Sequence, residues 1–286
     1  MATVDLHIHT IHSDGSKTPE EIVSMSRKHN INTIAITDHD NIDGSKKLID
    51  NHPADMTVYS GVELTIKTDV GRMHMLGYNI DLYDRKLNDY LIENKATSIY
   101  NLLLYIEIIK KDFGIVLTDE EIERLVTKPG NVGRPDIAVI LVQRGYCSNV
   151  SEAFDKYLRH AYKKASKVKK GITPQQGIDL IKGAGGIPVL AHPNSLLLSN
   201  PELEDKIIEL KSYGLEGIES THINENPRER KFFRYLAKKH NLLETGGTDY
   251  HGDNKPDVFL GTGRNHNVDI NDGDLSFHRL VKSRYR

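Results

Sequence analysis

The sequence predicts an α/β fold, in which parallel strands alternate with helices and can close into a barrel, together with an inserted helical region. Strand-like apolar stretches alternate with segments of helical period in residues 1–81 and 171–286, giving roughly seven strand–helix repeats. Residues 82–170 contain helical patterns and no convincing strand. Histidines or carboxylates follow most of the predicted strands. In β/α barrels, the active-site side chains lie at these C-terminal ends of the strands. We therefore predict a main domain over 1–81 and 171–286, and an inserted, mostly helical cap domain over 82–170.

Composition narrows the class of protein. The chain has 286 residues, of which 38% are hydrophobic, enough for a substantial core but well short of a membrane protein. No apolar run is long enough to span a bilayer and no signal peptide precedes the first strand, so no membrane association is expected. Cys147 is the only cysteine, which excludes internal disulfides and predicts a reducing, cytoplasmic location. The net charge of −2 gives no overall attraction to nucleic acid, and no obligate protein partner is predicted.

The first predicted strand carries two histidines. Residues 4–9 alternate between apolar and polar side chains, which is the period of a strand. His7 and His9 then project to the same side, where two imidazoles can hold one divalent metal, and Asp14 follows in the loop. On its own, this pair could equally be two unrelated polar side chains.

The next repeats place further ligands. Thr18 and Glu21 form a capping-box pattern for a helix that runs to about Lys28, and a strand over 33–37 follows, so the order implies a parallel β-α-β unit. His39 comes directly after that strand. Two more strand-like stretches carry Glu63 and His74.

The inserted region has helical patterns throughout. A long helix is expected over 86–111, and further helices start near Thr118, Arg134 and Val150.

The main domain resumes with a helix from Thr173. Later helices are expected over 202–213, 227–240 and 275–285. Strands are expected over 187–191, 215–220 and 243–247, followed respectively by His192, by His222, and by Asp249 with His251.

Nine side chains are candidate metal ligands: His7, His9, Asp14, His39, Glu63, His74, His192, Asp249 and His251. Nine nitrogen and oxygen donors exceed the needs of one ion, so two or three ions and at least one bridging carboxylate are expected. Imidazole with carboxylate suits zinc, iron or manganese. Clustered ions can share a hydroxide that attacks phosphorus, which predicts hydrolysis of a phosphate ester. No serine or cysteine nucleophile motif competes with this interpretation.

These stretches resemble a known family. Its pattern is carried by His7-Ile-His9, Thr37-Asp38-His39-Asp40, Gly61-Val-Glu63, His74-Met-Leu-Gly77, Ala191-His192-Pro193 and Gly247-Thr248-Asp249-Tyr250-His251. Together they resemble the motifs of the polymerase-and-histidinol-phosphatase (PHP) family over nearly the whole chain. The resemblance implies a distorted seven-stranded β/α barrel, a trinuclear site and phosphoesterase activity. Manganese is the ion we expect to support activity in vitro, with iron or zinc as alternatives.

The resemblance also implies an assignment of ligands to ions. One ion would take His7, His9, Glu63 and Asp249. A second would take Glu63, His74 and His192. A third would take Asp14, His39 and His251. Glu63 and Asp249 are therefore expected to be essential for catalysis.

Part of the inserted region suggests a branch of the family. Residues 133–138 and 154–158 resemble the branch that removes the 3′-phosphate of nucleoside 3′,5′-bisphosphates and trims short RNA from its 5′ end. Asp136 departs from the histidine expected there, so the resemblance leaves open whether nucleotide or phosphate is contacted near that position. A small-metabolite phosphatase of the histidinol-phosphate type is the alternative enzyme. A non-catalytic metal-binding module is the other alternative, although such a module should have lost ligands.

Several further side chains have two interpretations each. Arg134 could bind substrate phosphate or be an ordinary helix-start residue. His222 could touch the substrate or donate a proton to the leaving oxygen, or be a loop histidine. Asp38 and Asp40 could orient His39 or serve the loop. The basic run over 156–170 could attract phosphates, or form a solvated helix face.

Overall fold

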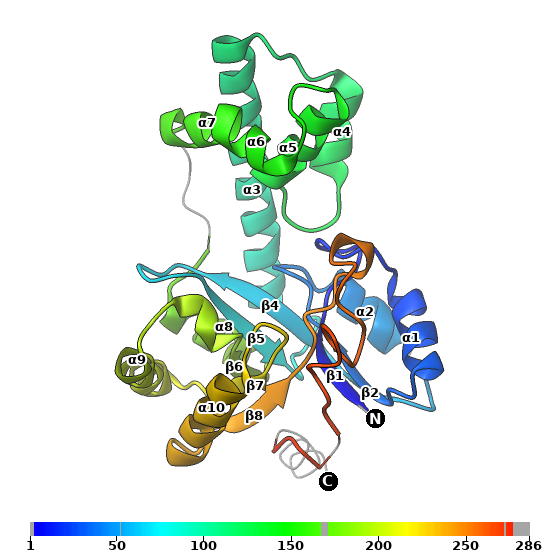
Figure 1. The fold of residues 1–286 in the computed structure, drawn as a ribbon, viewed down its shortest axis with the longest axis vertical. Helices are drawn as coiled ribbons and strands as arrows, with labels where there is room; N and C mark the ends of the chain where they lie inside the picture. Colours follow the sequence, from blue (N-terminus) through cyan, green and yellow to red (C-terminus); the bar gives the residue numbers. More distant parts are fainter. Residues whose placement is uncertain (1–2, 52, 167–170, 272, 277–286) are drawn as a thin grey trace. The chain divides into compact units, whose positions relative to one another are not determined.

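The computed structural model describes residues 3–51, 53–166, 171–271 and 273–276 (Figure 1). The chain divides into two compact units. The main unit comprises Met1–Asp89 with Gly171–Arg286, and the inserted unit comprises Tyr90–Lys170. That the inserted unit acts as a cap domain remains a prediction.

Eight strands of the described residues form two sheets in the main unit. The first sheet has the order β1-β2-β3, and its members pair in parallel: β1 (Val4–Ile8), β2 (Thr33–Ile36) and β3 (Thr57–Tyr59). The second sheet has the order β4-β5-β6-β7-β8, with these members: β4 (Gly61–Ile66), β5 (Met73–Tyr78), β6 (Ile187–Leu190), β7 (Gly217–Thr221) and β8 (Leu243–Gly246).

The prediction of strands that are all parallel is wrong for β5. This strand pairs antiparallel with both β4 and β6, whereas β6, β7 and β8 pair in parallel. The physical reason is the length of the connection: the short turn 67–72 joins β4 to β5, and a parallel crossover needs a dozen or more residues. β4 also follows β3 after a single residue, with no helix between them.

The two sheets meet without forming one continuous barrel among the described strands. Isolated bridges join Ile8 to Tyr250 and His39 to Glu63, so the C-terminal ends of the edge strand β1 and of the central strand β2 approach the second sheet. The observed architecture is therefore mixed α/β, and the closed seven-stranded barrel is not observed.

Helices cover the sheets of the main unit. α1 (Pro19–Lys28) and α2 (Asp43–Asp50) lie beside the first sheet, and α8 (Pro174–Gly183), α9 (Asn200–Tyr213) and α10 (Pro227–Lys239) lie beside the second (Figure 1). The core between these layers is apolar and includes Leu6, Ile34, Ile36 and Leu76, all fully buried. Within the described residues, no helix combines the length and apolar character needed to cross a membrane.

The predicted start of α1 is confirmed in detail. The Thr18 side chain accepts a hydrogen bond from the Glu21 N–H at 3.2 Å, and the Glu21 carboxylate accepts one from the Thr18 N–H at 2.8 Å. α2 was not predicted. Its residues Gly44 and Ser45 are weak helix formers, but a Cβ on Gly44 would lie 2.3 Å from the Asp38 carboxylate, so packing requires glycine there.

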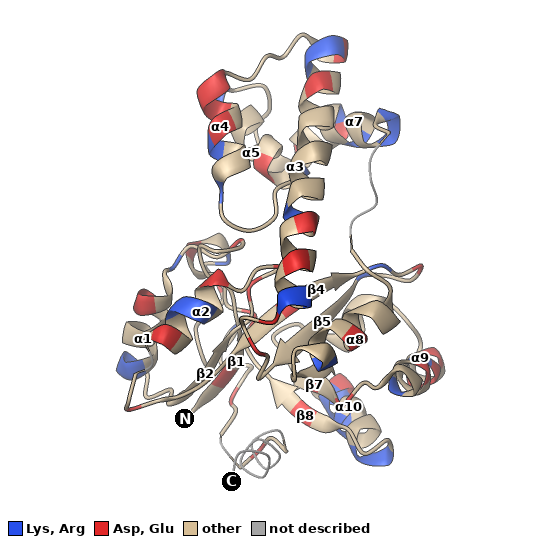
Figure 2. Cartoon of the chain, turned by 180° about the vertical axis from the view of Figure 1, so that it is seen from behind, with Lys and Arg blue, Asp and Glu red and all other residues tan. Residues whose placement is uncertain are grey.

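The described residues of the inserted unit form helices, and no strand is present among them. The unit contains most of α3 (Arg85–Phe113), then α4 (Asp119–Thr127), α5 (Arg134–Gln143), α6 (Val150–Ala153), a π-helical turn (Phe154–Leu158) and α7 (Arg159–Lys164). Leu102, Ile109, Ile137 and Leu141 belong to its own apolar core. Acidic residues occupy the first turn of α4, and basic residues lie in the last turn of α7 (Figure 2). The helix predicted over 275–285 falls mostly on residues 277–286, which lie outside the described residues.

Candidate metal centre

All nine predicted ligands belong to the main unit, and the structure brings them to one place. They lie in or just after the strands as follows: His7 in β1, His9 and Asp14 after β1, His39 after β2, Glu63 in β4, His74 in β5, His192 after β6, and Asp249 and His251 after β8. Seven of them line a cavity of about 390 Å³: Asp14, His39, Glu63, His74, His192, Asp249 and His251. His7 and His9 are fully buried beside Glu63.

Glu63 is the centre of this cluster. Its side chain is almost completely buried, and five imidazole nitrogens lie within 3.3 Å of its two oxygens. Oε2 is 3.3 Å from the Nε2 atoms of His7 and His9 and 3.0 Å from Nδ1 of His39. Oε1 is 2.9 Å from both Nδ1 of His74 and Nε2 of His192. Because its two oxygens face different sets of rings, the Glu63 carboxylate is suited to bridge two metal ions.

Two aspartates complete the cluster. Asp249 Oδ1 lies 3.2 Å from Nε2 of His9 and 3.6 Å from Nε2 of His7. Asp14 Oδ1 lies 3.2 Å from Nε2 of His251 and 3.6 Å from Nδ1 of His9. His9 therefore lies between the two carboxylates, and the cluster is continuous.

Buried polar atoms without partners show that these residues fit metal ions. Nε2 of His7, Nε2 of His9, Nδ1 of His39 and Oε2 of Glu63 are buried and make no hydrogen bond in the described structure. Leaving such atoms unsatisfied costs roughly 1–3 kcal/mol each, so their convergence needs a reason. Among the described residues, four groups have donor atoms within 4.8 Å of one another: His9 with Asp14, His39 and His251; His7 with His9 and Glu63; His39 with Glu63 and His74; and His7 with Glu219 and His222. Divalent cations held by imidazole and carboxylate would satisfy them.

A hydrogen bond from Nδ1 orients the rings of three of these histidines. Nδ1 of His7 donates to Glu219 Oε1 at 2.9 Å, which leaves Nε2 with a free lone pair. The Ser195 hydroxyl donates its proton to the Arg72 carbonyl at 2.8 Å. Nδ1 of His192, 2.9 Å from that hydroxyl oxygen, must therefore be the donor in the hydrogen bond between the ring and Ser195. Nδ1 of His251 donates to the Asp249 carbonyl at 2.7 Å. Each ring is thereby held in the tautomer that can ligate through Nε2.

Sequence analysis missed Glu219. Its carboxylate holds both the His7 ring and the His192 backbone N–H, the latter at 2.7 Å. It lies within β7 rather than after it, so it did not share the strand-end position that identified the other acids. β7 also carries the polar residues Ser220 and Thr221, so the local sequence did not set this acid apart.

Asp38 and Asp40 serve the loops. Asp38 accepts from the Thr10 N–H at 2.7 Å and from the Ser13 hydroxyl at 2.6 Å, which fixes the loop that carries Asp14. Asp40 accepts from the Thr65 N–H at 2.9 Å and hydroxyl at 2.7 Å. Of the two roles considered for these acids, the structure supports the loop role.

The charges in the cluster are strongly coupled. Burial alone would raise the pKa of the Glu63 carboxyl, but the imidazoles of His39 and His7 hold that pKa well below its ordinary value. Burial opposes a charge on His9, yet the carboxylates of Asp249 and Glu63 raise its pKa to about 10. Burial lowers the pKa of His39 to about 3, so this ring is neutral at pH 7 and has a lone pair to offer.

His222 also lines the cavity, but its ring is oriented differently. Its Nδ1 accepts a hydrogen bond from the Asn224 N–H at 3.2 Å, so in the neutral ring the proton is on Nε2. That Nε2 is buried, makes no hydrogen bond in the described structure and lies 3.5 Å from Asp249 Oδ2. A ring in this tautomer offers a proton rather than a lone pair to the cavity.

Arg134 lies in the inserted unit, at the first position of α5. Its guanidinium lies over the rings of Tyr162 and Phe154, at 4.1 Å and 5.5 Å from their centroids. Asp136 caps this helix start by accepting from the Gly133 N–H at 2.8 Å, and it pairs with Lys128 at 2.6 Å. The departure at Asp136 therefore has a local structural role.

Part of the basic run is paired within the inserted unit. Lys156 pairs with Glu152, Arg159 with Asp155, and Lys164 with Asp112. Residues 167–170 of the run lie outside the described residues. These ion pairs favour the interpretation of the run as a solvated helix face.

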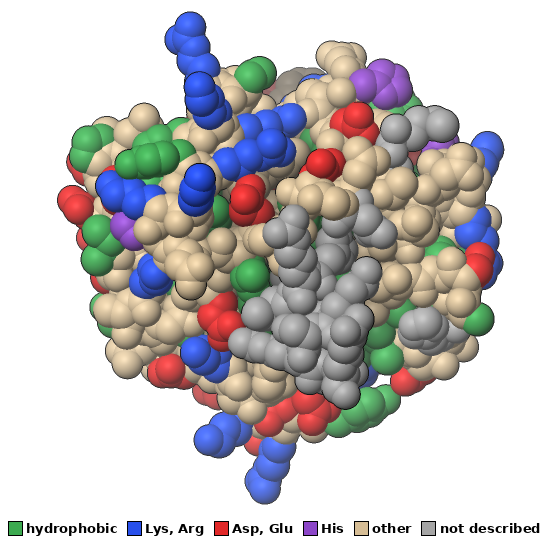
Figure 3. All heavy atoms as spheres, turned by 90° about the horizontal axis from the view of Figure 1, so that it is seen from below, with side chains coloured by type: hydrophobic (Ala, Val, Ile, Leu, Met, Phe, Trp, Pro, Cys, Tyr) green, Lys and Arg blue, Asp and Glu red, His purple; other side chains and the backbone are tan. Residues whose placement is uncertain are grey.

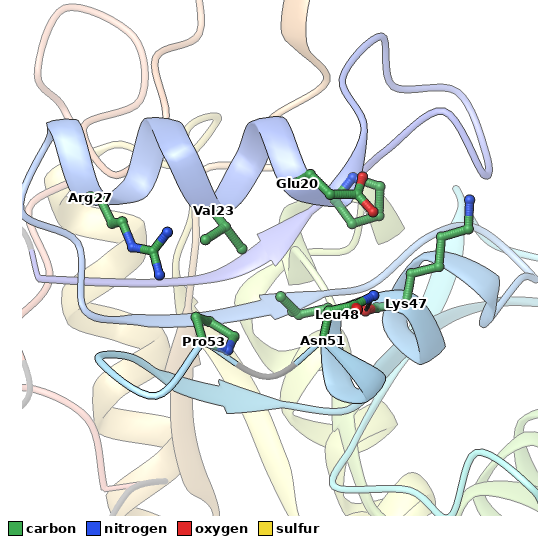
Figure 4. Close-up of a pocket in the computed structure, with 8 residues that line it drawn as sticks. Glu20, Val23, Arg27, Lys47, Leu48, Asn51 and Pro53 are labelled. Atoms are coloured by element: carbon green, nitrogen blue, oxygen red, sulfur yellow. Dashed lines mark hydrogen bonds between the residues drawn. The ribbon is translucent and has the colours of Figure 1, made fainter.

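A second cavity lies between α1 and α2 (Figure 4). Its volume is about 230 Å³, and Glu20, Val23 and Arg27 point into it from α1. It offers one carboxylate, on Glu20, and no histidine among its lining residues, so it lacks a metal-ligand set. The histidine-lined cavity is therefore the candidate active site.

The comparisons with known proteins agree with this chemistry. The PHP domain family matches residues 5–246. The 5′-3′ exoribonuclease Rnm of Escherichia coli is 30% identical over 250 residues, covering 86% of this chain and 84% of that protein. The 3′,5′-nucleoside bisphosphate phosphatase of Chromobacterium violaceum is 26% identical over 255 residues, covering 88% of each.

Solved structures show the same fold. A candidate metal-dependent phosphoesterase from Bifidobacterium adolescentis has a TM-score of 0.75 and 28% identity, covering 94% of this chain and 93% of that chain. An amidohydrolase from Chromobacterium violaceum has a TM-score of 0.77 at 23% identity, covering 99% and 97%, and shows the fold alone. The chain therefore belongs to the PHP domain family and is a metal-dependent phosphoesterase, a hydrolase of phosphate esters.

Proposed function

We propose that the protein removes the 3′-phosphate of nucleoside 3′,5′-bisphosphates, with short 5′-phosphorylated RNA as a further substrate. The observation that carries the proposal is the buried cluster around Glu63, whose unpartnered donor atoms converge beside an open cavity. The substrate class is supported by two relatives, a 5′-3′ exoribonuclease and a 3′,5′-nucleoside bisphosphate phosphatase, each aligned with more than four-fifths of this chain.

Two or three divalent ions would be held by three ligand groups. His7, His9, Glu63 and Asp249 form the first, Glu63, His74 and His192 the second, and Asp14, His39 and His251 the third. The distances around Glu63 and Asp14 support this division. When bound, such ions acidify water and polarise the phosphoryl oxygens. Manganese is the ion proposed for assays, with iron or zinc as alternatives in the cell, where the lone buried cysteine suits a reducing cytoplasm.

His222 is proposed as the proton donor. In hydrolysis the oxygen of water bonds to phosphorus, the ester P–O bond breaks, and the leaving oxygen must take a proton. As a general acid, His222 would act in its imidazolium form and donate the Nε2 proton; both ring nitrogens then carry protons, so Nδ1 gives up the hydrogen bond that it accepts from the Asn224 N–H in the neutral ring. Asp249 Oδ2 lies 3.5 Å from the same Nε2 atom.

Replacing His222 with asparagine should test that role. We expect kcat for a nucleotide substrate to fall roughly a hundredfold, the usual contribution of a general acid. The loss should be much smaller for p-nitrophenyl phosphate, whose leaving group needs no proton. An equal loss on both substrates would show that His222 does not protonate the leaving oxygen.

A substrate panel with manganese tests the proposed function itself. It should contain adenosine 3′,5′-bisphosphate, AMP, histidinol phosphate and 5′-phosphorylated oligoribonucleotides. We expect the highest kcat/KM for the bisphosphate, followed by the oligoribonucleotides. If histidinol phosphate were the best substrate, the protein would be a small-metabolite phosphatase, and if none were hydrolysed, the proposal would be overturned.

Arg134 is proposed as a phosphate contact from the inserted unit. A guanidinium can bind two phosphate oxygens at once, and the rings of Tyr162 and Phe154 hold this one in place. Arg134→Ala should raise KM for a bisphosphate more than KM for p-nitrophenyl phosphate, as measured by steady-state kinetics. Arg124→Ala, an exposed change in the same unit, is the control. Equal effects of Arg134→Ala on both substrates would remove Arg134 from this role.

The surface charge favours recognition inside the cavity over long-range attraction. Lys and Arg side chains share the face in Figure 3 with Asp and Glu side chains. Because the net charge is −2, the protein as a whole does not attract a polyanion. Affinity for an anionic substrate must therefore come from particular side chains.

A further inference from the structure

Two basic side chains line the cavity of the candidate metal centre, Arg72 and Lys255. Lys255 is already engaged by the protein, because its Nζ lies 2.7 Å from Asp249 Oδ2. The Arg72 guanidinium, by contrast, has no hydrogen-bond or ion-pair partner within the described part of the chain. Arg72 is thus a permanently charged residue in the cavity lining that forms an ion pair with none of the described carboxylates.

The backbone of Arg72 is fixed to the metal centre. Its N–H donates to the Ser195 carbonyl at 2.9 Å, and its carbonyl accepts from the Ser195 hydroxyl at 2.8 Å. The same hydroxyl accepts from the ring of His192, a candidate ligand. Gly71 permits this close approach, because a Cβ there would lie 2.3 Å from the Ser195 carbonyl oxygen. The base of the Arg72 side chain therefore holds a defined position relative to His192.

The strand geometry indicates which part of a substrate Arg72 can reach. Arg72 immediately precedes β5, and His74 lies two residues further along, so the two side chains share a face. A step of two residues along a strand is roughly 7 Å. Arg72 thus stands one step outward from the ring of His74, which lies 2.9 Å from Glu63. This position is next to the ligand cluster rather than within it.

We propose that Arg72 binds the second anionic group of the substrate, the phosphate that is not cleaved. The proposal rests on the proposed function and adds the side chain that distinguishes a bisphosphate from a monophosphate. A guanidinium holds a phosphate through two parallel N–H···O bonds. Lys255 cannot take this role without giving up its ion pair with Asp249.

Steady-state kinetics with two matched substrates tests the assignment. Adenosine 3′,5′-bisphosphate and adenosine 3′-monophosphate present the same scissile ester, and only the first has a second phosphate. For Arg72→Ala we expect KM for the bisphosphate to rise about tenfold or more, since the variant loses the charge-assisted hydrogen bonds to the second phosphate. Both constants for the monophosphate should stay within about twofold of wild type, and Arg72→Lys should lie between the two proteins.

Lys67→Ala provides the matched control. Lys67 is an exposed cation on the same β4–β5 turn, it is not among the lining residues of the cavity, and its backbone N–H bond to Ile172 survives the change. The Lys67→Ala variant should have the same kcat and KM as wild type for both nucleotides. Equal melting temperatures of the variants and wild type would show that folding is preserved.

Several results would overturn the assignment. Equal losses on the two substrates would mean that Arg72 contacts the reacting phosphate or supports the fold. Wild-type constants in Arg72→Ala would mean that it contacts no substrate group. If the wild-type protein hydrolysed neither nucleotide, the proposed function would fail first, and the assignment of Arg72 would fail with it.

Discussion

Replacing Asp249 with alanine is expected to lower kcat by about a thousandfold or more for every phosphate ester, while the protein stays folded. Asp249 Oδ1 faces the Nε2 atoms of His7 and His9, and Oδ2 faces His222 and Lys255. One change therefore removes a candidate ligand and the partner of the candidate proton donor. Losses of this size are typical when electrostatic stabilisation of the transition state is removed.

Asp253→Ala is the control for that experiment. Asp253 is close in sequence but exposed, and it pairs with Lys17 at 2.8 Å, away from the ligand cluster. It should keep full activity with p-nitrophenyl phosphate, and circular dichroism should show both variants folded. Full activity of Asp249→Ala would remove this residue from the site.

Metal removal is the second change with a large expected effect. After treatment with a chelator, activity should fall to background, and added manganese should restore it, because the donor atoms that line the cavity suit metal ions and bound ions would supply the activated water. Unchanged turnover by protein shown to be free of metal would contradict this expectation.

The melting temperature gives a measure of metal binding that does not depend on activity. An ion that binds only the folded chain stabilises it, by about 2.7 kcal/mol at a hundredfold excess over Kd. Manganese should therefore raise the melting temperature of the chelator-treated protein. The rise should be smaller in a variant such as Glu63→Gln, which lacks the bridging charge.

Most of the ligands could be predicted from the sequence because of where they occur. His7, His39, His192 and Asp249 lie in or directly after a strand, and strand ends in an α/β protein meet at one edge. Their convergence therefore followed from local patterns. The ion-by-ion division of ligands came from family resemblance and stays a proposal.

Side chains whose roles depend on contacts through space were missed. Glu219 lies inside β7, and only the 2.9 Å contact with His7 reveals its function. Arg72 lies in a hairpin turn, where a basic residue is ordinary, and only the cavity gives it meaning. No local pattern in the sequence reports either contact.

The fold was predicted only in part for the same reason, because some of its features depend on contacts between distant residues. The capping box at Thr18 and Glu21 is a local signal, and α1 begins where it indicates. Strand direction is a non-local property, so the antiparallel pairing of β5 escaped the repeat pattern. The short turn between β4 and β5 was the one clue, because it is too short for a crossover helix.

The most direct measurement is the number of manganese ions bound per chain at equilibrium, by dialysis followed by elemental analysis. The wild-type protein is expected to bind two or three ions tightly, and Glu63→Gln to bind fewer, since its carboxylate lies against the rings of two ligand groups. A wild-type protein that bound no manganese, zinc or iron, or that bound them equally well without the Glu63 carboxylate, would contradict the account.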